Sequence, residues 1–320
     1  MTLLDSLFNQ MIFLFIFIVI GFILAKGNFV SESAANVISK LENTVFIPGL
    51  ILSTFIQSCS AAKLISAWDI LLSGLVTVIV LVPVSLLVAK FCSKDICLRN
   101  IIVYGLVFPN FGYMGNAIIS AVFPDSFFEY TVFTMAFWPL IYLWGVPALL
   151  IPGEAGEHPS LSSRLKSFLN PMMIAMVLGL VLGLTGWGMK LPTSVLSVIN
   201  VSGNCMSPLA MILTGITMGR SDVLGILKKW RIYMVCAIRL LAYPLVTFGI
   251  LIALKELGFF IPMVFRCAVC MAALPMGLNG IVIPTAYGKD TSDAAGMVLV
   301  SHLLSIITIP LIFMLVETVL

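Results

Sequence analysis

Two short segments interrupt stretches of this chain that are otherwise apolar enough to cross a lipid bilayer. They read Pro109-Asn110-Phe111-Gly112-Tyr113-Met114-Gly115-Asn116 and Pro275-Met276-Gly277-Leu278-Asn279-Gly280. Proline and glycine break the hydrogen-bond ladder of a helix, and hydrocarbon holds no water to satisfy the freed backbone groups. Such breaks persist only where protein or an aqueous cavity surrounds them. The pair therefore indicates a binding site at the midplane of a secondary transporter.

The sequence around the first interruption is similar to the sequence around the second. Four features recur in the same order, offset by 160 to 167 residues: Asn43 and Asn204, Pro48 and Pro208, Arg99 and Arg266, and Asp125 and Asp290. The offset is about half the chain, so the pattern indicates an internal duplication. We predict a first five-helix repeat over 1–151 and a second over 169–320.

The composition places the chain in a membrane. It is 61% hydrophobic and 10% charged, whereas soluble proteins contain about 25% charged residues. A spanning helix needs about 20 mainly apolar residues. Ten segments qualify, near 8–25, 36–57, 69–90, 99–120, 128–151, 169–187, 192–218, 230–254, 264–287 and 294–317. The predicted fold class is an all-α integral membrane protein with ten transmembrane helices, two of them broken.

The positive charges of the loops set the expected orientation, because lysine and arginine are retained on the cytoplasmic side. The odd-numbered loops hold eleven such residues and the even-numbered loops four, so we expect both termini outside, in the periplasm. Five helices per half then make the repeats inverted, and the broken helices can cross at mid-membrane. The polar stretch 152–168, which includes His158, is expected to be a cytoplasmic linker. The first span ends at Lys26 without a small-residue cleavage site, which favours a retained helix over a signal peptide.

Three asparagines in the interruptions are the main candidates for binding. The side chains of Asn110, Asn116 and Asn279 donate and accept hydrogen bonds, and the N–H groups at the start of a half-helix suit carboxylates. These asparagines are either caps of the broken backbone or ligands of an anionic substrate, and the two roles are compatible. The remaining residues of the predicted site are Gly112, Tyr113, Gly277 and Leu278, with Pro109, Gly115, Pro275 and Gly280 at the crossover.

Two ionisable side chains inside predicted spans complete the predicted binding residues. Arg239 lies about ten residues into the eighth helix, where it pairs with an anionic substrate, snorkels to the interface or has a structural role. His302 either titrates near neutral pH or is a buried histidine bonded to a neighbour. No carboxylate lies at mid-helix, so an ion-coupling role would fall to His302, Glu42, Asp69 or neutral oxygens.

We expect no cofactor, no metal and no nucleic-acid partner. Cys267 and Cys270 form a CxxC pair without a second ligand pair, which predicts buried structural thiols. The net charge of +3 resides in short loops. Signatures of intramembrane enzymes, namely a rhomboid-like serine, HExxH and paired aspartates, are missing, so an enzyme is not expected.

The two crossover segments are accompanied by two further motifs, Asn204-Cys205-Met206-Ser207-Pro208-Leu209-Ala210 and Pro284-Thr285-Ala286-Tyr287-Gly288. Through these four segments the chain resembles the auxin efflux carrier family over essentially its whole length. That family includes bacterial malate and malonate permeases, is related to the plant PIN auxin exporters, and shares a five-plus-five inverted-repeat fold with the bile acid:sodium symporters. The second crossover differs from bacterial relatives, which more often have proline, a small residue and valine before the asparagine.

The resemblance implies an elevator-type carrier of small organic anions in a bacterial inner membrane, as a homodimer. Helices 1, 2, 6 and 7 would form a scaffold, and helices 3 to 5 and 8 to 10 a transport domain. Sodium binding in the symporter relatives uses acidic side chains near the second crossover, and none occurs between Arg266 and Asp290. The alternatives are a sodium-coupled symporter of the bile acid type, or a membrane receptor or channel on the same fold.

Overall fold

The computed structural model describes residues 3–31, 33–150, 171–220, 225, 228–258, 261–286 and 292–318. Within these ranges the chain forms helices and short connections, with no β-strand. The chain is therefore an all-α protein, as predicted. The predicted linker at 152–168 and its His158 lie outside the described residues, and the division into two repeats stays a prediction.

The helices of the first half include three π-helical segments, which lie in the second, fourth and fifth predicted spans. Their bounds are α1 Leu3–Lys26, α2 Ala34–Leu41, η1 Glu42–Phe46, α3 Ile47–Ser58, α4 Ala61–Ser66, α5 Trp68–Cys92, α6 Ile96–Val107, η2 Phe111–Gly115, α7 Asn116–Val122, η3 Pro124–Ser126, α8 Phe127–Met135, α9 Phe137–Leu140 and η4 Ile141–Leu150.

The second half has the same alternation of long helices and interrupted ones. Its elements are α11 Pro171–Thr185, η5 Gly188–Lys190, α12 Thr193–Gly219, α14 Trp230–Ala237, η6 Ile238–Ala242, α15 Tyr243–Glu256, α16 Pro262–Ala273, α17 Asn279–Ala286 and α18 Ser292–Glu317.

Helices lie in all ten segments predicted to span the membrane, but not all of them are long enough to span it alone. Five helical runs of the described residues have the length and composition of a span, or six if the bent pair Pro124–Leu140 and Leu143–Leu150 counts as one. Shorter apolar helices include Ile96–Val107, Phe111–Val122 and Pro262–Ala273, which are short because proline-containing segments interrupt them. The chain is thus a multi-pass membrane protein, and the number of ten spans stays a prediction.

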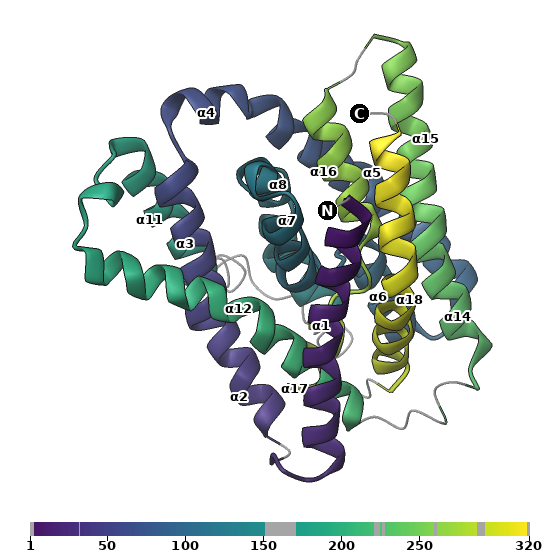
Figure 1. Ribbon diagram of the computed structural model, residues 1–320. Helices are drawn as coiled ribbons and strands as arrows, with labels where there is room; N and C mark the ends of the chain where they lie inside the picture. The colour runs from purple at the N-terminus through teal and green to yellow at the C-terminus, as the bar shows by residue number, and fades with distance from the viewer. Residues whose placement is uncertain are drawn as a thin grey trace.

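The helices pack in two groups. In the first group α12 runs along α1 and crosses α3, and α3 packs against α11. In the second, α5 packs on α6 and α8, while α16 and α18 pack on each other and on α15 and α14. Figure 1 shows α2, α3, α11 and α12 on the left, α14, α15 and α18 on the right, and α7 and α8 between them.

Glycine brings α1 and α12 into backbone contact. A Cβ on Gly21 would overlap the carbonyl of Ile212, and one on Gly215 would overlap the carbonyl of Ile18. Lipid tails give no hydrophobic drive for helices to associate, so close backbone packing at small residues supplies the attraction instead. The α1–α12 pair is therefore a tightly joined unit.

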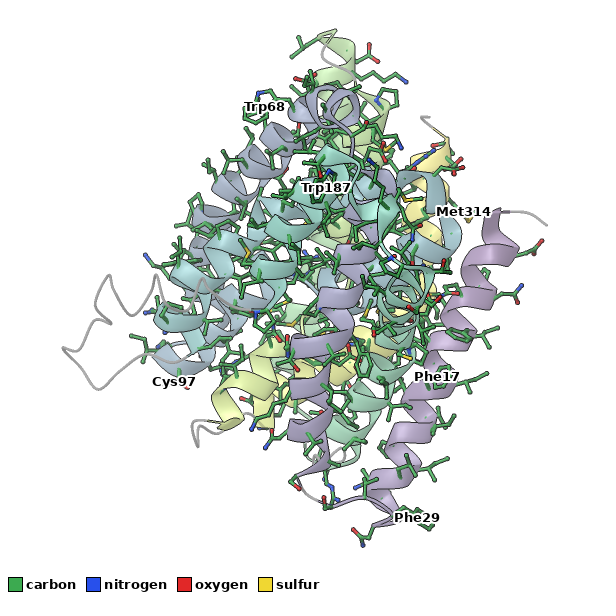
Figure 2. The ribbon with its side chains drawn as sticks, turned by 90° about the vertical axis from the view of Figure 1, so that its left-hand side faces the viewer. Phe17, Phe29, Trp68, Cys97, Trp187 and Met314 are labelled. Atoms are coloured by element: carbon green, nitrogen blue, oxygen red, sulfur yellow. The ribbon has the colours of Figure 1, made fainter. Side chains whose placement is uncertain are left out.

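Exposed side chains mark the lipid-facing surface and its two ends. Apolar residues of α1 such as Phe13, Ile16 and Val19 are exposed, and Phe17 beside them is half-buried (Figure 2). Trp68 and Trp187 lie towards one end of the molecule, and Phe29 and Cys97 towards the other. Tryptophan is enriched at membrane–water interfaces. In the predicted topology Trp68 and Trp187 belong to even-numbered loops, and Phe29 and Cys97 to odd-numbered ones.

Candidate functional site at the crossing of two interrupted helices

Both interrupted helices stop where proline enters the chain. The helix α6 ends at Val107, and the chain bends through Phe108 and Pro109 before η2 begins at Phe111. The helix α16 ends at Ala273, with extended backbone at Leu274, and α17 begins at Asn279. Proline lacks an N–H and disfavours helical backbone in the residue before it. The residues between each pair of helices are therefore free to adopt extended conformations.

The two breaks touch each other through backbone atoms. Pro109 and Met276 form an isolated antiparallel bridge, and the N–H of Asn110 donates to the carbonyl of Pro275 over 2.8 Å. A Cβ on Gly277 would lie 3.0 Å from the carbonyl oxygen of Phe108, so glycine permits this close approach. The crossing of the two helices thus satisfies part of the backbone that each break exposes.

Arg239 satisfies carbonyls at the end of α16. Its side chain is buried, and Nε donates to the carbonyl of Leu274 while Nη2 donates to that of Met271, both over 3.0 Å. The guanidinium also lies 5.6 Å from the ring centroid of Tyr243. A cation at a helix C-terminus compensates the partial negative charge there. In this structure Arg239 holds the second break and does not line the cavity described below.

Asn110 is oriented by a histidine behind it. The amide Nδ2 of Asn110 lies 2.9 Å from Nε2 of His302, and Nδ1 of His302 lies 2.8 Å from the carbonyl of Val298. A carbonyl only accepts, so Nδ1 carries the proton and Nε2 accepts from the asparagine. The other amide atom of Asn110, Oδ1, is buried and has no hydrogen-bond partner in the described part of the chain. This unpaired acceptor belongs to a residue that lines the cavity.

Asn116 caps the turn that follows the first break. Its Nδ2 donates to the carbonyl of Gly112 over 2.9 Å, and the side chain does not line the cavity. Gly115 is required for packing beside it, because a Cβ there would overlap the hydroxyl of Tyr130. The geometry gives Asn116 a capping contact, one of the two roles that the sequence leaves open.

A small cavity lies at the crossing. Six of the predicted site residues line it together: Asn110, Gly112, Tyr113, Gly277, Leu278 and Asn279. Asn43, Tyr104, Phe108, Phe111 and Trp138 also contribute to its walls. No charged side chain is among its lining residues in the described part of the chain. Its free volume is about 20 Å³, which is roughly the room that one water molecule needs.

Sequence reasoning missed several of these wall residues. Asn43 served only as a marker of the duplication, yet its Nδ2 donates to the hydroxyl of Tyr113 over 3.3 Å and to the carbonyl of Ser39 over 2.7 Å. The hydroxyl of Tyr104 interacts with the side chain of Asn279. A polar residue inside an apolar span was the available signal for Asn43. Tyr104 and Trp138 have no such signal, because aromatic residues fill lipid-facing and core positions alike.

A larger groove lies elsewhere, between α5 and α15. Its volume is about 670 Å³, and its walls are mostly valine, leucine and isoleucine of two lipid-exposed helices, such as Val76, Val80 and Val246. Its lining is almost entirely apolar and offers no set of converging polar groups to hold an anion. We therefore place the candidate site at the crossing, where three amide side chains and two helix starts meet.

Comparison with known proteins agrees with this architecture. The family model described as "Membrane transport protein" matches residues 6–313. The chain belongs to this family, which is the auxin efflux carrier family. No curated protein matches the chain.

Proposed function

We propose that this membrane transport protein carries small organic anions by elevator-type alternating access. The anions are mono- or dicarboxylates, a class to which auxin-like acids belong. The observation that carries the proposal is the cavity at the crossing, where the amides of Asn43, Asn110 and Asn279 meet the starts of η2 and α17. Helix starts present unbonded N–H groups with partial positive charge. Such groups bind a carboxylate without a cationic side chain.

The aromatic walls support a ligand with an apolar body beside its carboxylate. Tyr104, Phe108 and Trp138 offer ring surfaces on which such a body packs. The volume of about 20 Å³ does not admit a carboxylic acid of this kind. In our proposal this conformation is closed, and movement of the second helix group past α1, α3, α11 and α12 opens the cavity to one side and then to the other.

Setting and assembly belong to the same proposal. We place the carrier in a bacterial inner membrane with both termini in the periplasm, on the strength of the loop charges. The first turn of α1 and the last turn of α18 lie towards the same end of the molecule (Figure 1), which is compatible with an even number of crossings. The partners are the lipid bilayer and a second copy of the chain, joined through the first helix group.

The test combines binding and flux. Thermal-shift measurements on the purified protein with malate, malonate, phenylacetate and indole-3-acetate should show stabilisation by at least one acid, because a ligand of the native state raises its stability. Asn110→Ala and Asn279→Ala should each weaken binding of that acid by about 1–3 kcal/mol, or about 5- to 150-fold. Asn204→Ala, an exposed amide outside the cavity, is the matched control and should bind like the parent.

Flux in proteoliposomes separates the competing functions. A carrier gives saturable uptake of the stabilising acid and exchange across the membrane, whereas a channel gives uptake that does not saturate. A receptor binds without flux, and a symporter of the bile acid type requires a sodium gradient. If both asparagine variants fold, bind and transport like the parent, the asparagines are only caps and the binding site lies elsewhere.

A further inference from the structure

Glu42 is a fully buried carboxyl at the junction of α2 and α3, in the first third of their helical run. It is 0% exposed, and neither Oε1 nor Oε2 has a hydrogen-bond partner among the residues that the structure describes. It begins the π-helical turn η1 that joins α2 to α3. Single π-turns inside α-helices are frequent at functional sites, since they cost hydrogen-bond geometry. A buried carboxyl with a purely structural role is expected to have hydrogen-bond partners, and Glu42 has none among the described residues.

The surroundings of Glu42 offer no compensating charge. The elements that pack most against η1 are α2, α3, α11 and α12. Their described titratable side chains are Lys40, which is exposed, and Cys205, which is half-buried. From η2, the phenol of Tyr113 is near enough to interact electrostatically with Glu42. An ionised carboxylate in such a place costs far more than a neutral one, so a bound proton is the least costly state.

Glu42 is one residue away from the candidate binding cavity. The next residue, Asn43, lines the cavity and donates to the hydroxyl of Tyr113 over 3.3 Å. Tyr113 belongs to the turn after the first break, whereas Asn43 belongs to the helix run of the first group. The Asn43–Tyr113 contact therefore joins the first helix group to the turn after the first break, beside Glu42. A movement of that turn relative to the first group breaks this contact and changes the environment of Glu42.

From this geometry we infer that Glu42 is a proton-binding site that couples a proton to the carried anion; the inference rests on the proposed function. In the open state, an Oε of the Glu42 carboxylate takes a proton from hydronium on one side of the membrane, forming an O–H bond and leaving water. In the closed state the neutral carboxyl is buried without partners. On opening to the other side, the same proton passes to water and regenerates the carboxylate and hydronium.

A proton fits this site better than a metal cation does. Hard cations in proteins take about six oxygen ligands, and no group of three or more histidine, cysteine or acidic side chains gathers in the described residues. A proton needs one oxygen atom. The carboxyl of Glu42 supplies that atom, so this site can bind a proton without further ligands.

Infrared difference spectroscopy tests the proton without knowledge of the substrate. Subtracting the spectrum of Glu42→Gln from that of the parent at pH 7 should reveal the C=O stretch of a protonated carboxyl. The exposed Glu256 gives the control Glu256→Gln, whose difference spectrum should contain carboxylate bands instead. Carboxylate bands from Glu42 would overturn the inference. If the Glu42→Gln protein is poorly folded, Glu42→Asp serves as the second variant. It keeps an ionisable carboxyl and should retain the band of a protonated carboxyl.

Transport in proteoliposomes tests the coupling, with radiolabelled malate and phenylacetate as probes. An inward proton gradient should drive accumulation by the parent, and Glu42→Gln should exchange the probe across the membrane but accumulate it only to the level without a gradient. Accumulation by Glu42→Gln at the parental level, or accumulation driven by sodium and not by protons, would refute the coupling. If the parent moves neither probe, the proposed function fails, while the infrared result still decides the protonation of Glu42.

Discussion

Two side chains that look alike from the sequence, Arg239 and Asn110, differ in what they contact. Each is a buried polar residue inside an apolar span. The side chain of Arg239 donates hydrogen bonds to the carbonyls of Met271 and Leu274. Asn110 keeps one amide atom unpaired beside the cavity. The first contact stabilises a helix end, and the second leaves an atom available to a ligand.

We expect Arg239→Met to destabilise the protein and not to change the ligand contacts directly. Removing the guanidinium takes from the buried carbonyl of Leu274 the donor that the structure gives it and leaves the carbonyl of Met271 with the N–H of Leu274. Loss of such a bond costs about 1–3 kcal/mol of the free energy of unfolding. Thermal unfolding in detergent measures this cost. Arg231→Met, at an exposed position near the start of the same helical run, is the control and should unfold like the parent. A variant at position 239 with parental stability and lost binding would place the guanidinium in the site.

His302 should act on binding through Asn110. In His302→Leu the amide of Asn110 loses its acceptor and is free to turn, so binding of the stabilising acid should weaken. Because the two residues share one hydrogen bond, the effects of His302→Leu and Asn110→Ala should not add in the double variant, with a coupling of about 0.5–3 kcal/mol. Isothermal titration of the four proteins measures it. Additive effects would show that His302 does not position Asn110.

At the scale of elements, the breaks are the part of the structure that the sequence predicts best. Proline at 109 and 275 forbids a continuous ladder, and the helices stop within two residues of each. The π-turns η1 and η6 contain neither proline nor glycine, but Pro48 and Pro244 each follow two residues after the π-turn ends. A proline cannot donate to the preceding turn, so the sequence marks the neighbourhood of these turns and not their pitch.

We expect Gly277→Val to separate the two breaks. A Cβ at this position already lies 3.0 Å from the carbonyl of Phe108 and 3.4 Å from that of Pro109, and a branched side chain needs more room. Overpacking of this kind costs about 1–3 kcal/mol, and binding of the acid should be lost with it. Gly249→Val is the matched control, since nothing lies within 4 Å of a Cβ there. Equal stability and binding in both variants would mean that the breaks do not need their close approach.

At the scale of the whole molecule, the sequence predicts where helices begin and end better than it predicts which helices contact one another. Charge counts and apolar runs locate loops along the chain. They do not reveal that residues of η1 and η2 meet, as Asn43 and Tyr113 do, because pairing across 70 positions depends on how the helices are arranged. For this reason the sequence predicts that Asn110 and Asn279 line the site, but it does not predict that Asn43 and Trp138 line it too.

The orientation of the molecule can be tested with a cysteine that the chain already has. Cys97 is exposed and lies at the end opposite to Trp187 (Figure 2). A membrane-impermeant maleimide should label Cys97 only after the cells are permeabilised, because its loop is on the positively charged side. Trp187→Cys in a Cys97→Ser background should be labelled in intact cells. The reverse pattern would invert the proposed topology.

The crossing of the two breaks is built from main-chain atoms, namely the bridge between Pro109 and Met276 and the hydrogen bond from Asn110 to Pro275. Main-chain atoms are the same whatever side chains surround them. Mutation is therefore free to replace aromatic or aliphatic walls of the cavity while the junction keeps its shape. A descendant of this chain acquires a new cargo through such replacements, and selection for cargo and selection for folding act on largely separate sets of atoms.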